Sequence, residues 1–379
     1  MGNVLSKYHL PGETIGIIGG GQLGQMMSST AKEKGYKVII LDPTSDCPAA
    51  QVSDEQIIAE YDDFDSLKEL AEKCDVLTYE FENVDAETIE EIKKYTDVPQ
   101  GTRALTITQN RRSEKDFLME NEFPVVANII VRNEDDFLKA LNQLGYPSIL
   151  KTVEGGYDGK GQILIQDDEY DKELVHQLIK SSICILESKI VLKKEVSVVI
   201  SSNSKDQHSV FPIIENEHRN NILHISNCPA RVSEEIKTQA YEISRSIAKK
   251  LSLVGTMCIE FFVSENNELF VNEIAPRPHN SGHLTIESCN ISQFDAHIRG
   301  ICGWKMPQVK QFSPAIMVNL LGQHLNKSKN KLIEHSDWNF HDYGKYQCKL
   351  DRKMGHITIL TDDIDNEILK LKNNPIWND

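Results

Sequence analysis

The first hundred residues alternate short apolar runs with longer amphipathic segments. The apolar runs predict strands over Thr14–Ile18, Lys37–Leu41, Gln56–Ala59 and Val76–Tyr79. The intervening segments predict helices over Gln22–Lys34, Phe64–Lys73 and Ala86–Tyr95. Alternation of this kind is typical of an α/β domain with a parallel sheet, which binds ligands beyond the carboxyl ends of its strands. We expect this domain to cover residues 1–102.

From about Arg103 the pattern becomes α+β, with antiparallel strands. Helices are predicted over Ser113–Glu122, Glu134–Leu144, Asp171–Lys180 and Ser233–Leu251. Strands are predicted over Ser148–Val153, Gln162–Ile165, Ile183–Leu186, Glu195–Ile200 and His208–Ile214, with a hairpin of Met257–Val263 and Glu268–Ile274. After Gly303, strands over Ala315–Leu321 and His356–Thr361 predict a small β-rich tail. The division into domains is therefore 1–102, 103–303 and 304–379.

Charge and cysteine usage narrow the class of protein. The 379 residues include 41 Lys and Arg against 57 Asp and Glu, a net charge of −16, which argues against a nucleic-acid coat or a polybasic membrane surface. The eight cysteines form no CxxC pair, so we expect reduced core thiols in place of disulfides or a zinc site. No apolar run approaches the ~20 residues that span a bilayer.

Met1–Thr14 has neither the basic stretch nor the apolar core of a secretory signal, so we do not expect one there. Met1–Ser6 fits the permissive N-myristoylation pattern, although a leader before the first strand is the favoured interpretation. We expect a soluble, cytoplasmic protein.

The first glycine-rich loop follows the first predicted strand. Gly19, Gly21 and Gly24 satisfy GxGxxG, and Asp42 ends the second strand, as in a dinucleotide-binding fingerprint. Free N–H groups at a helix start suit any anion, and tight turn packing without a ligand is the alternative. We favour a phosphate-facing loop and disfavour NAD, because a better nucleotide site lies further along the chain.

A second glycine-rich loop, Gly155–Gly161, has four glycines in the seven residues Gly155-Gly156-Tyr157-Asp158-Gly159-Lys160-Gly161. A plain hairpin needs fewer, so we expect a lid whose backbone approaches phosphates closely. Lys151 lies just before it, and strand alternation places Lys151 on one face with Ile149 and Val153. A lysine on an apolar face needs an anionic partner, which ATP phosphates supply. The alternative is a lysine that snorkels from an edge strand.

Two carboxylates are predicted to oppose each other on the later hairpin. If Asn266 and Asn267 form a two-residue turn, Glu260 lies directly opposite Glu273, on one face with Phe262, Val271 and Leu269. Opposed like charges destabilise a sheet unless something compensates, and Mg²⁺ takes carboxylate oxygens. The alternatives are a solvated pair, a bulge that shifts the register, or a shared proton.

A polar cluster follows Glu273 closely. Arg277 can bind a small oxyanion through two N–H groups, and His279 and Asn280 add donors. Pro276 and Pro278 stiffen the chain there. A merely polar loop is the alternative interpretation.

Taken together, these residues resemble a known family. Lys151, the second glycine loop, Glu187, Glu195, Glu260 and Asn272-Glu273 resemble the ATP-grasp superfamily. More narrowly, the chain is similar to the 5-(carboxyamino)imidazole ribonucleotide synthases, on these segments: Gly19–Gly24, Tyr79–Val84, Gly156–Gly161, Glu215–Asn220, Asn272–His283 and Arg352–His356. The resemblance implies a Rossmann-like pre-ATP-grasp domain, a central ATP-grasp domain and a small C-terminal domain.

The resemblance also implies residue roles. The ATP-binding residues would be Arg111, Lys151, Gly156, Tyr157, Asp158, Gly159, Lys160, Gly161, Glu187, Ser188, Lys189, Ile190, Glu195, His218, Asn272 and Glu273. Glu260 and Glu273 would hold Mg²⁺. The acceptor-binding residues would be Gly21, Gln22, Leu23, Glu80, Tyr157, Asp158, Arg277, Lys345 and Arg352, and the catalytic ones Arg277, Lys151, His279 and Asn280. For Glu187, Glu195, His218, Lys345 and Arg352, side-chain chemistry alone would give solvated or surface residues.

The implied reaction is carboxylation of 5-aminoimidazole ribonucleotide with ATP and bicarbonate through carboxyphosphate, in purine biosynthesis. A homodimer is expected, with no NAD, biotin, nucleic acid or membrane. No general base is obvious; Asp158 and His279 are the candidates. The rival hypotheses are an NAD-dependent oxidoreductase, a nucleotide-binding protein without turnover, a formate-using transformylase and a biotin carboxylase.

Overall fold

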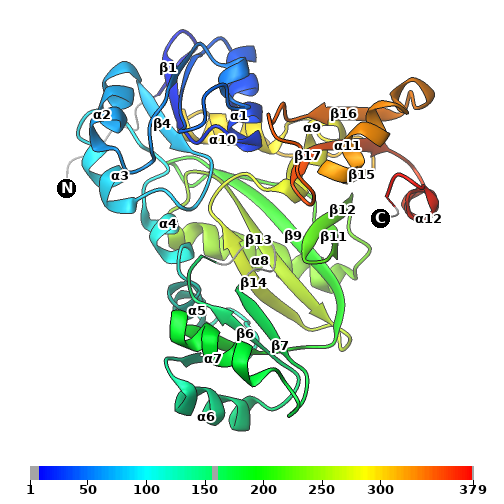
Figure 1. Cartoon of the computed structure of the whole chain (residues 1–379). Coiled ribbons are helices and arrows are strands. Elements are labelled where there is room, and N and C mark those ends of the chain that lie inside the picture. The colour runs from blue at the N-terminus through cyan, green and yellow to red at the C-terminus, as the bar shows by residue number, and fades with distance from the viewer. Residues whose placement is uncertain (1–7, 156–160, 378–379) are drawn as a thin grey trace.

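The computed structural model describes residues 8–155 and 161–377 of the chain. These residues form three β-sheets in different parts of the molecule (Figure 1). A small parallel sheet lies at one end, a long antiparallel sheet runs through the middle, and a third sheet lies at the other end. Among the described residues, no helix combines the length and the apolar composition that spanning a bilayer requires.

The N-terminal sheet is parallel, as predicted, with strand order β3-β2-β1-β4. Its strands are β1 (Thr14–Ile18), β2 (Lys37–Leu41), β3 (Glu55–Ile57) and β4 (Val76–Tyr79). The connecting helices are α1 (Gln22–Glu33), η1 (Ala50–Val52), α2 (Phe64–Lys73) and α3 (Ala86–Ile92). A helix from far along the chain, α10 (Gln293–Ile301), completes the core, because its Phe294 and Ile298 pack with Ile17 and Met27.

A four-stranded antiparallel sheet, order β5-β8-β6-β7, forms a small lobe at the other end of the molecule (Figure 1). Its strands are β5 (Asn128–Val131), β6 (Ser148–Thr152), β7 (Gln162–Ile165) and β8 (Cys184–Ser188); its helices are α6 (Glu134–Leu144) and α7 (Lys172–Ser181). The Asn133 side chain caps α6 by accepting from the Asp136 N–H, and Gly145 ends the helix with a φ of +74°. Two short helices lead into the lobe, α4 (Arg103–Thr108), which the apolar pattern did not predict, and α5 (Arg111–Glu120).

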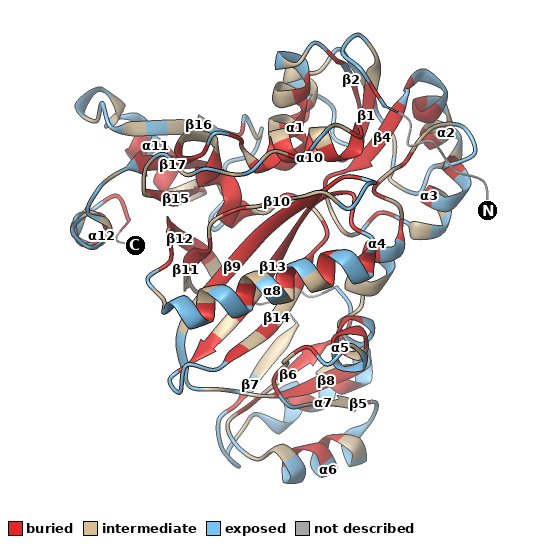
Figure 2. Ribbon diagram, turned by 180° about the vertical axis from the view of Figure 1, so that it is seen from behind, coloured by how far each residue is buried: buried red, intermediate tan, exposed pale blue. Residues whose placement is uncertain are grey.

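The central sheet has nine strands, in the order β14-β13-β9-β11-β12-β15-β17-β16, with β10 beside β9. The central-region strands are β9 (Leu192–Ser202), β10 (His208–Val210), β11 (Ile214–Arg219), β12 (Ile222–Cys228), β13 (Gly255–Ser264) and β14 (Leu269–Ala275). Helix α8 (Glu234–Leu251) covers one face (Figure 2), where Ile236 and Ile247 pack against Val198 and Met257.

The predicted C-terminal strands extend this same sheet, because β12 pairs with β15. The remaining elements are η2 (Asn280–Leu284), α9 (Thr285–Ser288), β15 (Ala315–Leu321), α11 (Gly322–Lys329), η3 (Leu332–Glu334), β16 (Trp338–Asp342), β17 (Lys353–Leu360) and α12 (Ile364–Asn373). Ile225 of β12 shares a core with Val318 and Ile357 of the tail strands. The tail therefore shares its sheet and part of its core with the central region.

Several element predictions differ from the structure, which also contains β5 and β16, two strands that the apolar pattern did not predict. The predicted strand His208–Ile214 is two strands, β10 and β11, separated around Pro212, which has no N–H to donate to a ladder. The helix predicted to reach Tyr95 ends at Ile92. Strand β12 was missed because buried polar residues such as His224 and Asn227 interrupt its apolar pattern.

The β13–β14 hairpin confirms one part of its prediction and contradicts another. Glu260 lies directly opposite Glu273, as predicted, but the register shifts by one residue between this pair and the turn. The assumed two-residue turn at Asn266-Asn267 is therefore wrong, since the Ser264 N–H donates to the Glu268 carbonyl. This bulge places Val271 and Leu269 in the core beside α8, so their predicted position on the carboxylate face is wrong. One extra residue in a strand reverses the alternation beyond it. As a result Asn272 and Glu273, although consecutive, both line the cavity described next.

Candidate functional site

A cavity of about 770 Å³ lies between the small lobe and the nine-stranded sheet. Residues of the N-terminal sheet's loops, including Gln22 and Glu80, also line it. The predicted site residues that line the cavity are Gln22, Leu23, Glu80, Arg111, Lys151, Glu187, Ser188, Lys189, Ile190, Glu195, His218, Glu260, Asn272, Glu273, Arg277, His279 and Asn280. The fold thus brings together segments that are distant in the sequence. Their order along the chain was what suggested a common site.

Four predicted residues that the structure describes are absent from this lining: Gly21, Gly161, Lys345 and Arg352. Lys345 is half-buried and its Nζ donates to the carbonyl of Lys353, a cavity residue, at 2.7 Å. Arg352 is exposed and donates to the carbonyl of Gln347. The remaining predicted residues, Gly156, Tyr157, Asp158, Gly159 and Lys160, lie outside the described residues, as does Met1–Ser6.

The first glycine loop binds carboxylates of the protein itself. The N–H groups of Gly21 and Gly24 each donate to the Glu80 carboxylate at 2.5 Å, and the Gly20 N–H donates to Asp42. Burial raises the pKa of Glu80 above its ordinary value, although these amides oppose the shift. The expectation that these amides face a phosphate is therefore wrong, because side chains already occupy all three.

Close approach of Glu80 explains the glycines of that loop. A Cβ at Gly21 would lie 2.7 Å from Glu80 Oε1, and a Cβ at Gly19 would lie 2.3 Å from Glu80 Cγ. Gly19 also has a φ of +106°, which L side chains rarely adopt. The GxGxxG pattern here therefore results from packing around a buried carboxylate.

Lys151 of β6 has an anionic partner within the protein, Glu187 of β8, at 2.5 Å. Lys115 of α5 lies 3.7 Å from the same carboxylate. Burial alone would raise the pKa of Glu187, but the charges of Lys151 and Lys115 lower it to about 2. Glu187 is 3% exposed, so this glutamate is a buried ion-pair residue and not a solvated strand end.

The bulge in β14 is held by the first turn of α5. The Lys115 ammonium donates to the Asn272 carbonyl at 2.7 Å, and the Ile274 N–H donates to the Glu114 carboxylate at 2.6 Å. Burial raises the pKa of Glu114 to about 7. Since β14 is the edge strand of its sheet, these contacts satisfy backbone groups that no neighbouring strand can reach.

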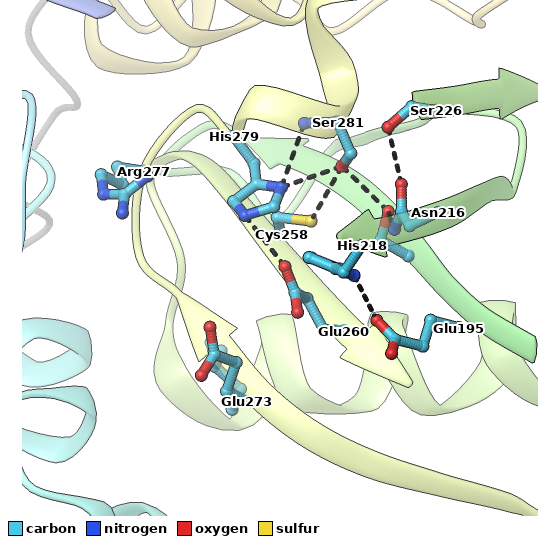
Figure 3. Close-up of polar contacts among 12 residues, drawn as sticks. Glu195, Asn216, His218, Ser226, Cys258, Glu260, Glu273, Arg277, His279 and Ser281 are labelled. Atoms are coloured by element: carbon cyan, nitrogen blue, oxygen red, sulfur yellow. Dashed lines mark hydrogen bonds and ion pairs between the residues drawn. The ribbon is translucent and has the colours of Figure 1, made fainter. Parts of the chain in front are cut away.

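The opposed carboxylates are each compensated by a cationic side chain. His279 Nε2 lies 3.0 Å from Glu260, and Arg111 lies 3.5 Å from Glu273 (Figure 3 shows the two glutamates). Burial would raise the pKa of Glu260, but the hydrogen bond and charge of His279 lower it. Two carboxylates that face one cavity fit a Mg²⁺ ion shared with phosphate oxygens. The donor set therefore fits the predicted metal.

His279 lies at the end of a buried hydrogen-bonded series (Figure 3). Its Nδ1 lies 2.8 Å from the Ser281 hydroxyl, which is 2.9 Å from the Ser197 hydroxyl. The Asn216 amide donates to Ser197 and accepts from Ser226. Nearby, the His218 Nδ1 lies 2.5 Å from Glu195, whose charge raises the pKa of His218 although burial opposes this.

Arg277 is held by Glu82 through two hydrogen bonds, of 2.5 and 3.1 Å. Burial would raise the pKa of Glu82, but Arg277 lowers it. Figure 3 shows Arg277 and His279 on different sides of the chain segment that carries them. The segment can therefore present a guanidinium and an imidazole to the cavity from separate positions.

Sequence reasoning missed Glu82, Glu114, Lys115 and Lys353, although Glu82, Glu114 and Lys353 line the cavity. Glu82 and Lys353 lie within segments that carry the resemblance, so that motif could have found them. Lys115 and Glu114 are adjacent charges on an ordinary amphipathic helix, and nothing in the sequence marks them as buried.

Comparisons with family models cover most of the chain. Residues 12–109 match a ribonucleotide synthetase pre-ATP-grasp domain, and residues 116–294 match an ATP-grasp domain. Residues 315–370 match a phosphoribosylaminoimidazole carboxylase C-terminal domain. The order of the three models agrees with the order of the predicted domains.

Similar proteins and structures agree with these models. An N5-carboxyaminoimidazole ribonucleotide synthase of Staphylococcus epidermidis is 46% identical over 354 residues, covering 93% of this chain and 94% of the relative. The crystal structure of a Staphylococcus aureus N5-carboxyaminoimidazole synthetase complexed with ADP has a TM-score of 0.94 and 45% identity, covering 97% and 98% of the two chains. An Aspergillus clavatus synthase in complex with ADP and 5-aminoimidazole ribonucleotide has a TM-score of 0.88 and 28% identity, covering 96% and 97%.

Proposed function

The chain belongs to the N5-carboxyaminoimidazole ribonucleotide synthases, which carboxylate aminoimidazole ribonucleotide with ATP in purine biosynthesis, and we propose how its residues divide that work. The observation that carries the proposal is the convergence of Lys151 and Glu187, Glu260 and Glu273, and Arg277 and His279 on one cavity. The proposed reaction has two parts, activation of bicarbonate by ATP and capture of the activated carboxyl group by the aromatic amine.

In the first part, a bicarbonate oxygen attacks the γ-phosphorus of ATP, and the bond to the β-phosphate oxygen breaks to release ADP. Phosphoryl transfer of this type depends on positioning and on neutralisation of charge. Arg111 and Lys151 bind the phosphates, Glu187 and the backbone of Ser188–Ile190 bind the adenine, and Glu195 binds the ribose with His218 beside it. The position of Lys151 beside Glu187 at 2.5 Å supports this, since one buried pair then reaches both base and phosphates.

Glu260 and Glu273, with Asn272 beside them, would hold Mg²⁺. Bound there, the ion would neutralise phosphate charge. Glu273→Gln should then abolish bicarbonate-dependent ADP release and weaken Mg²⁺ binding measured by titration calorimetry. Normal Mg²⁺ affinity and turnover in this variant would remove Glu273 as a ligand.

In the second part, the exocyclic amine attacks the carbonyl carbon of carboxyphosphate or of CO₂ released from it. The new C–N bond gives a carbamate, and the amine nitrogen loses a proton. On the carboxyphosphate route phosphate leaves as its C–O bond breaks after the amine attacks, whereas on the CO₂ route that bond breaks before the attack. Arg277, His279 and Asn280 line the bicarbonate and acceptor side of the cavity, bordered by Glu80 and Gly21–Leu23. Lys345 and Arg352 bind the ribose 5-phosphate, and Arg352→Ala should mainly raise KM for the ribonucleotide.

Carboxyphosphate hydrolyses readily, so water must be excluded during the reaction. The Gly155–Gly161 loop is the proposed lid, with Tyr157 and Asp158 over the acceptor. The homodimer, the cytoplasmic location and the domain boundaries at residues 102 and 303 are further parts of this proposal.

One assay tests the proposed function against its rivals. ADP release is measured with bicarbonate, with formate and with neither, in the presence and absence of 5-aminoimidazole ribonucleotide. We expect release that requires bicarbonate and increases with the ribonucleotide. Formate-dependent release would favour a transformylase, and no release under any condition would favour a nucleotide-binding protein.

A further inference from the structure

We propose that two buried glutamines, Gln100 and Gln293, are positioning residues that fix the Pro276–His279 segment from its two ends. The inference rests on the proposed function, because Arg277 and His279 are the groups that this segment presents to bicarbonate and acceptor. Neither glutamine lines the cavity, so each would act through the segment and not on a substrate.

Gln293, the first residue of α10, binds the backbone of His279 at both of its polar groups. Its Oε1 accepts from the His279 N–H at 2.9 Å, and its Nε2 donates to the His279 carbonyl at 2.7 Å. The side chain is fully buried, and a Cβ at Gly282 would lie only 2.5 Å from Oε1. Gln293 thus holds His279 as a strand partner would, and the imidazole reaches Glu260 from that fixed backbone.

Gln100 binds the other end of the segment, where its Nε2 donates to the Pro276 carbonyl at 2.9 Å. Its Oε1 accepts from the Thr78 hydroxyl at 2.6 Å. Oε1 also accepts from the Tyr79 N–H at 3.4 Å. Because the Pro276 carbonyl can only accept and the Tyr79 N–H can only donate, the orientation of this side chain is set. Gln100 is 8% exposed and Thr78 is fully buried.

The direction of every hydrogen bond leading to Gln100 is also set. The Thr256 N–H can only donate, and it donates to His297 Nδ1 at 3.1 Å. Burial lowers the pKa of His297 to about 3, so the ring is neutral and its proton lies on Nε2. That proton is donated to the Thr78 hydroxyl at 2.8 Å, and Thr78 in turn donates to Gln100.

The two glutamines come from parts of the chain that join different layers. Gln100 follows the N-terminal sheet, whereas α10 packs both on α1 and against β13. The Pro276–His279 segment is therefore aligned with the N-terminal sheet and the nine-stranded sheet together. Glu82, which binds Arg277, also follows the N-terminal sheet. The Arg277 guanidinium and the backbone that carries it are therefore both positioned by residues that follow this sheet.

The test uses Gln100→Glu and Gln293→Glu in the full-length enzyme. Each replaces an NH₂ by an oxygen that faces a backbone carbonyl, with almost no change of shape. Since a small misplacement of reacting groups costs up to about 100-fold in rate, we expect kcat to fall about 10- to 100-fold and KM for bicarbonate to rise about 10-fold. KM for ATP should stay within about 2-fold, because Lys151 and Glu187 are unaffected.

A second readout is the ratio of ADP formed to carboxylated product. A loosened segment should let activated bicarbonate react with water, so the ratio should rise above that of the wild type. A general loss of stability would not change this ratio. Gln100→Met and Gln293→Met, which remove both amide functions, decide the question if the glutamate variants do not fold.

The matched control is Gln311→Glu. The Gln311 amide donates to the carbonyls of Cys228 and Ser313 at 2.9 and 3.1 Å, and Gln311 does not line the cavity. This variant should keep the wild-type KM for bicarbonate and product ratio, even where its melting temperature falls. Wild-type values of both quantities in the folded Gln100 and Gln293 variants would overturn the inference.

Arg277→Lys separates this inference from the proposed function. If it raises KM for bicarbonate while the glutamine variants do not, the positioning role alone is overturned. If Arg277→Lys also leaves KM for bicarbonate unchanged, the assigned role of Arg277 is wrong and the inference falls with it.

Discussion

Glu187 and Glu80 are two buried carboxylates that line the same cavity, and different groups bind them. Glu187, in the small lobe, is bound by the ammonium groups of Lys151 and Lys115. Glu80, after the N-terminal sheet, is bound by backbone N–H groups of the glycine loop. The pKa of Glu187 falls to about 2, whereas burial raises that of Glu80. At Glu187 the full positive charges of the lysines outweigh the cost of burying an ionised carboxylate. At Glu80 the peptide dipoles reduce that cost but do not outweigh it.

The largest effect is expected from Lys151→Met. Breaking a buried ion pair costs about 3–5 kcal/mol, and we expect the low end because Lys115 stays 3.7 Å from Glu187. If Lys151 binds the ATP phosphates as proposed, loss of its charge should lower kcat/KM for ATP about 100- to 1000-fold. Urea unfolding and steady-state kinetics measure the two effects. The exposed Lys193→Met is the control and should change neither.

Combining Lys151→Met with Glu187→Met sharpens the comparison. The double variant leaves no uncompensated carboxylate, but it removes a partner of the buried Lys115 ammonium, which keeps its hydrogen bond to the Asn272 carbonyl. It should therefore recover part of the lost stability and none of the lost activity. If stability does not recover, the pair is not what makes the Lys151 substitution costly.

The next effect is the pH dependence of Glu187. Its pKa in the folded protein, about 2, lies below the ordinary value, so its stabilisation is fully present above about pH 5 and is lost as the pH falls toward 2. The shift corresponds to about 3 kcal/mol. The difference in unfolding free energy between wild type and Glu187→Gln should therefore shrink as the pH falls from 7 to 3. A difference that stays constant from pH 7 to pH 3 would contradict the lowered pKa of Glu187.

Glu80 should show the opposite slope. Its pKa in the folded protein is raised, so ionisation is penalised and the wild type loses stability as the pH rises above about 4.3. Glu80→Gln leaves one glycine N–H facing an amide NH₂, at a cost of about 1–3 kcal/mol near pH 5. The difference in unfolding free energy between the wild type and Glu80→Gln should decrease toward pH 8. An increase with pH would place Glu80 in the same class as Glu187.

Gly21→Ala should have the smallest effect, about 1 kcal/mol, because the added Cβ meets the movable end of Glu80 at 2.7 Å and not backbone. Thermal unfolding measures it. Adding Glu80→Asp, which shortens the side chain, should relieve the contact. If the destabilisation of the double variant equals or exceeds the sum of the two single-variant destabilisations, the contact with Glu80 is not the cause of the Gly21→Ala effect.

The hairpin shows how far the sequence allowed the site to be predicted. Counting residues from an assumed two-residue turn at Asn266-Asn267 placed Glu260 opposite Glu273, and the pair is correct although the assumed turn is not. Val263 pairs with Leu269 and the Ser264 N–H donates to the Glu268 carbonyl, so the pairing next to the turn is one residue out of the assumed register, and the bulge restores it at Glu260. The count could not reveal this bulge, since the bulge depends on Lys115 and Glu114, more than a hundred positions away, binding the backbone of β14. Val271 and Leu269 were therefore assigned to the wrong face.

The first glycine loop likewise shows a local feature that the sequence indicated and a distant partner that it did not. GxGxxG correctly indicated a tight strand-to-helix turn whose N–H groups bind an anion. The pattern did not specify which anion, and Glu80, 56 positions after Gly24, occupies the amides.

The sequence by itself determined the elements with strong local periodicity, among them β1, β2, α2, β4, α6, β7 and β15, and through its ordered motifs it determined the family. The tertiary structure alone decided which partner each buried charge and amide received. Arg277 meets Glu82 across 195 positions, and Gln100 meets Pro276 across 176. The physical reason is that periodicity reports which face of an element is buried, whereas partners in a low-dielectric interior are chosen by packing between elements.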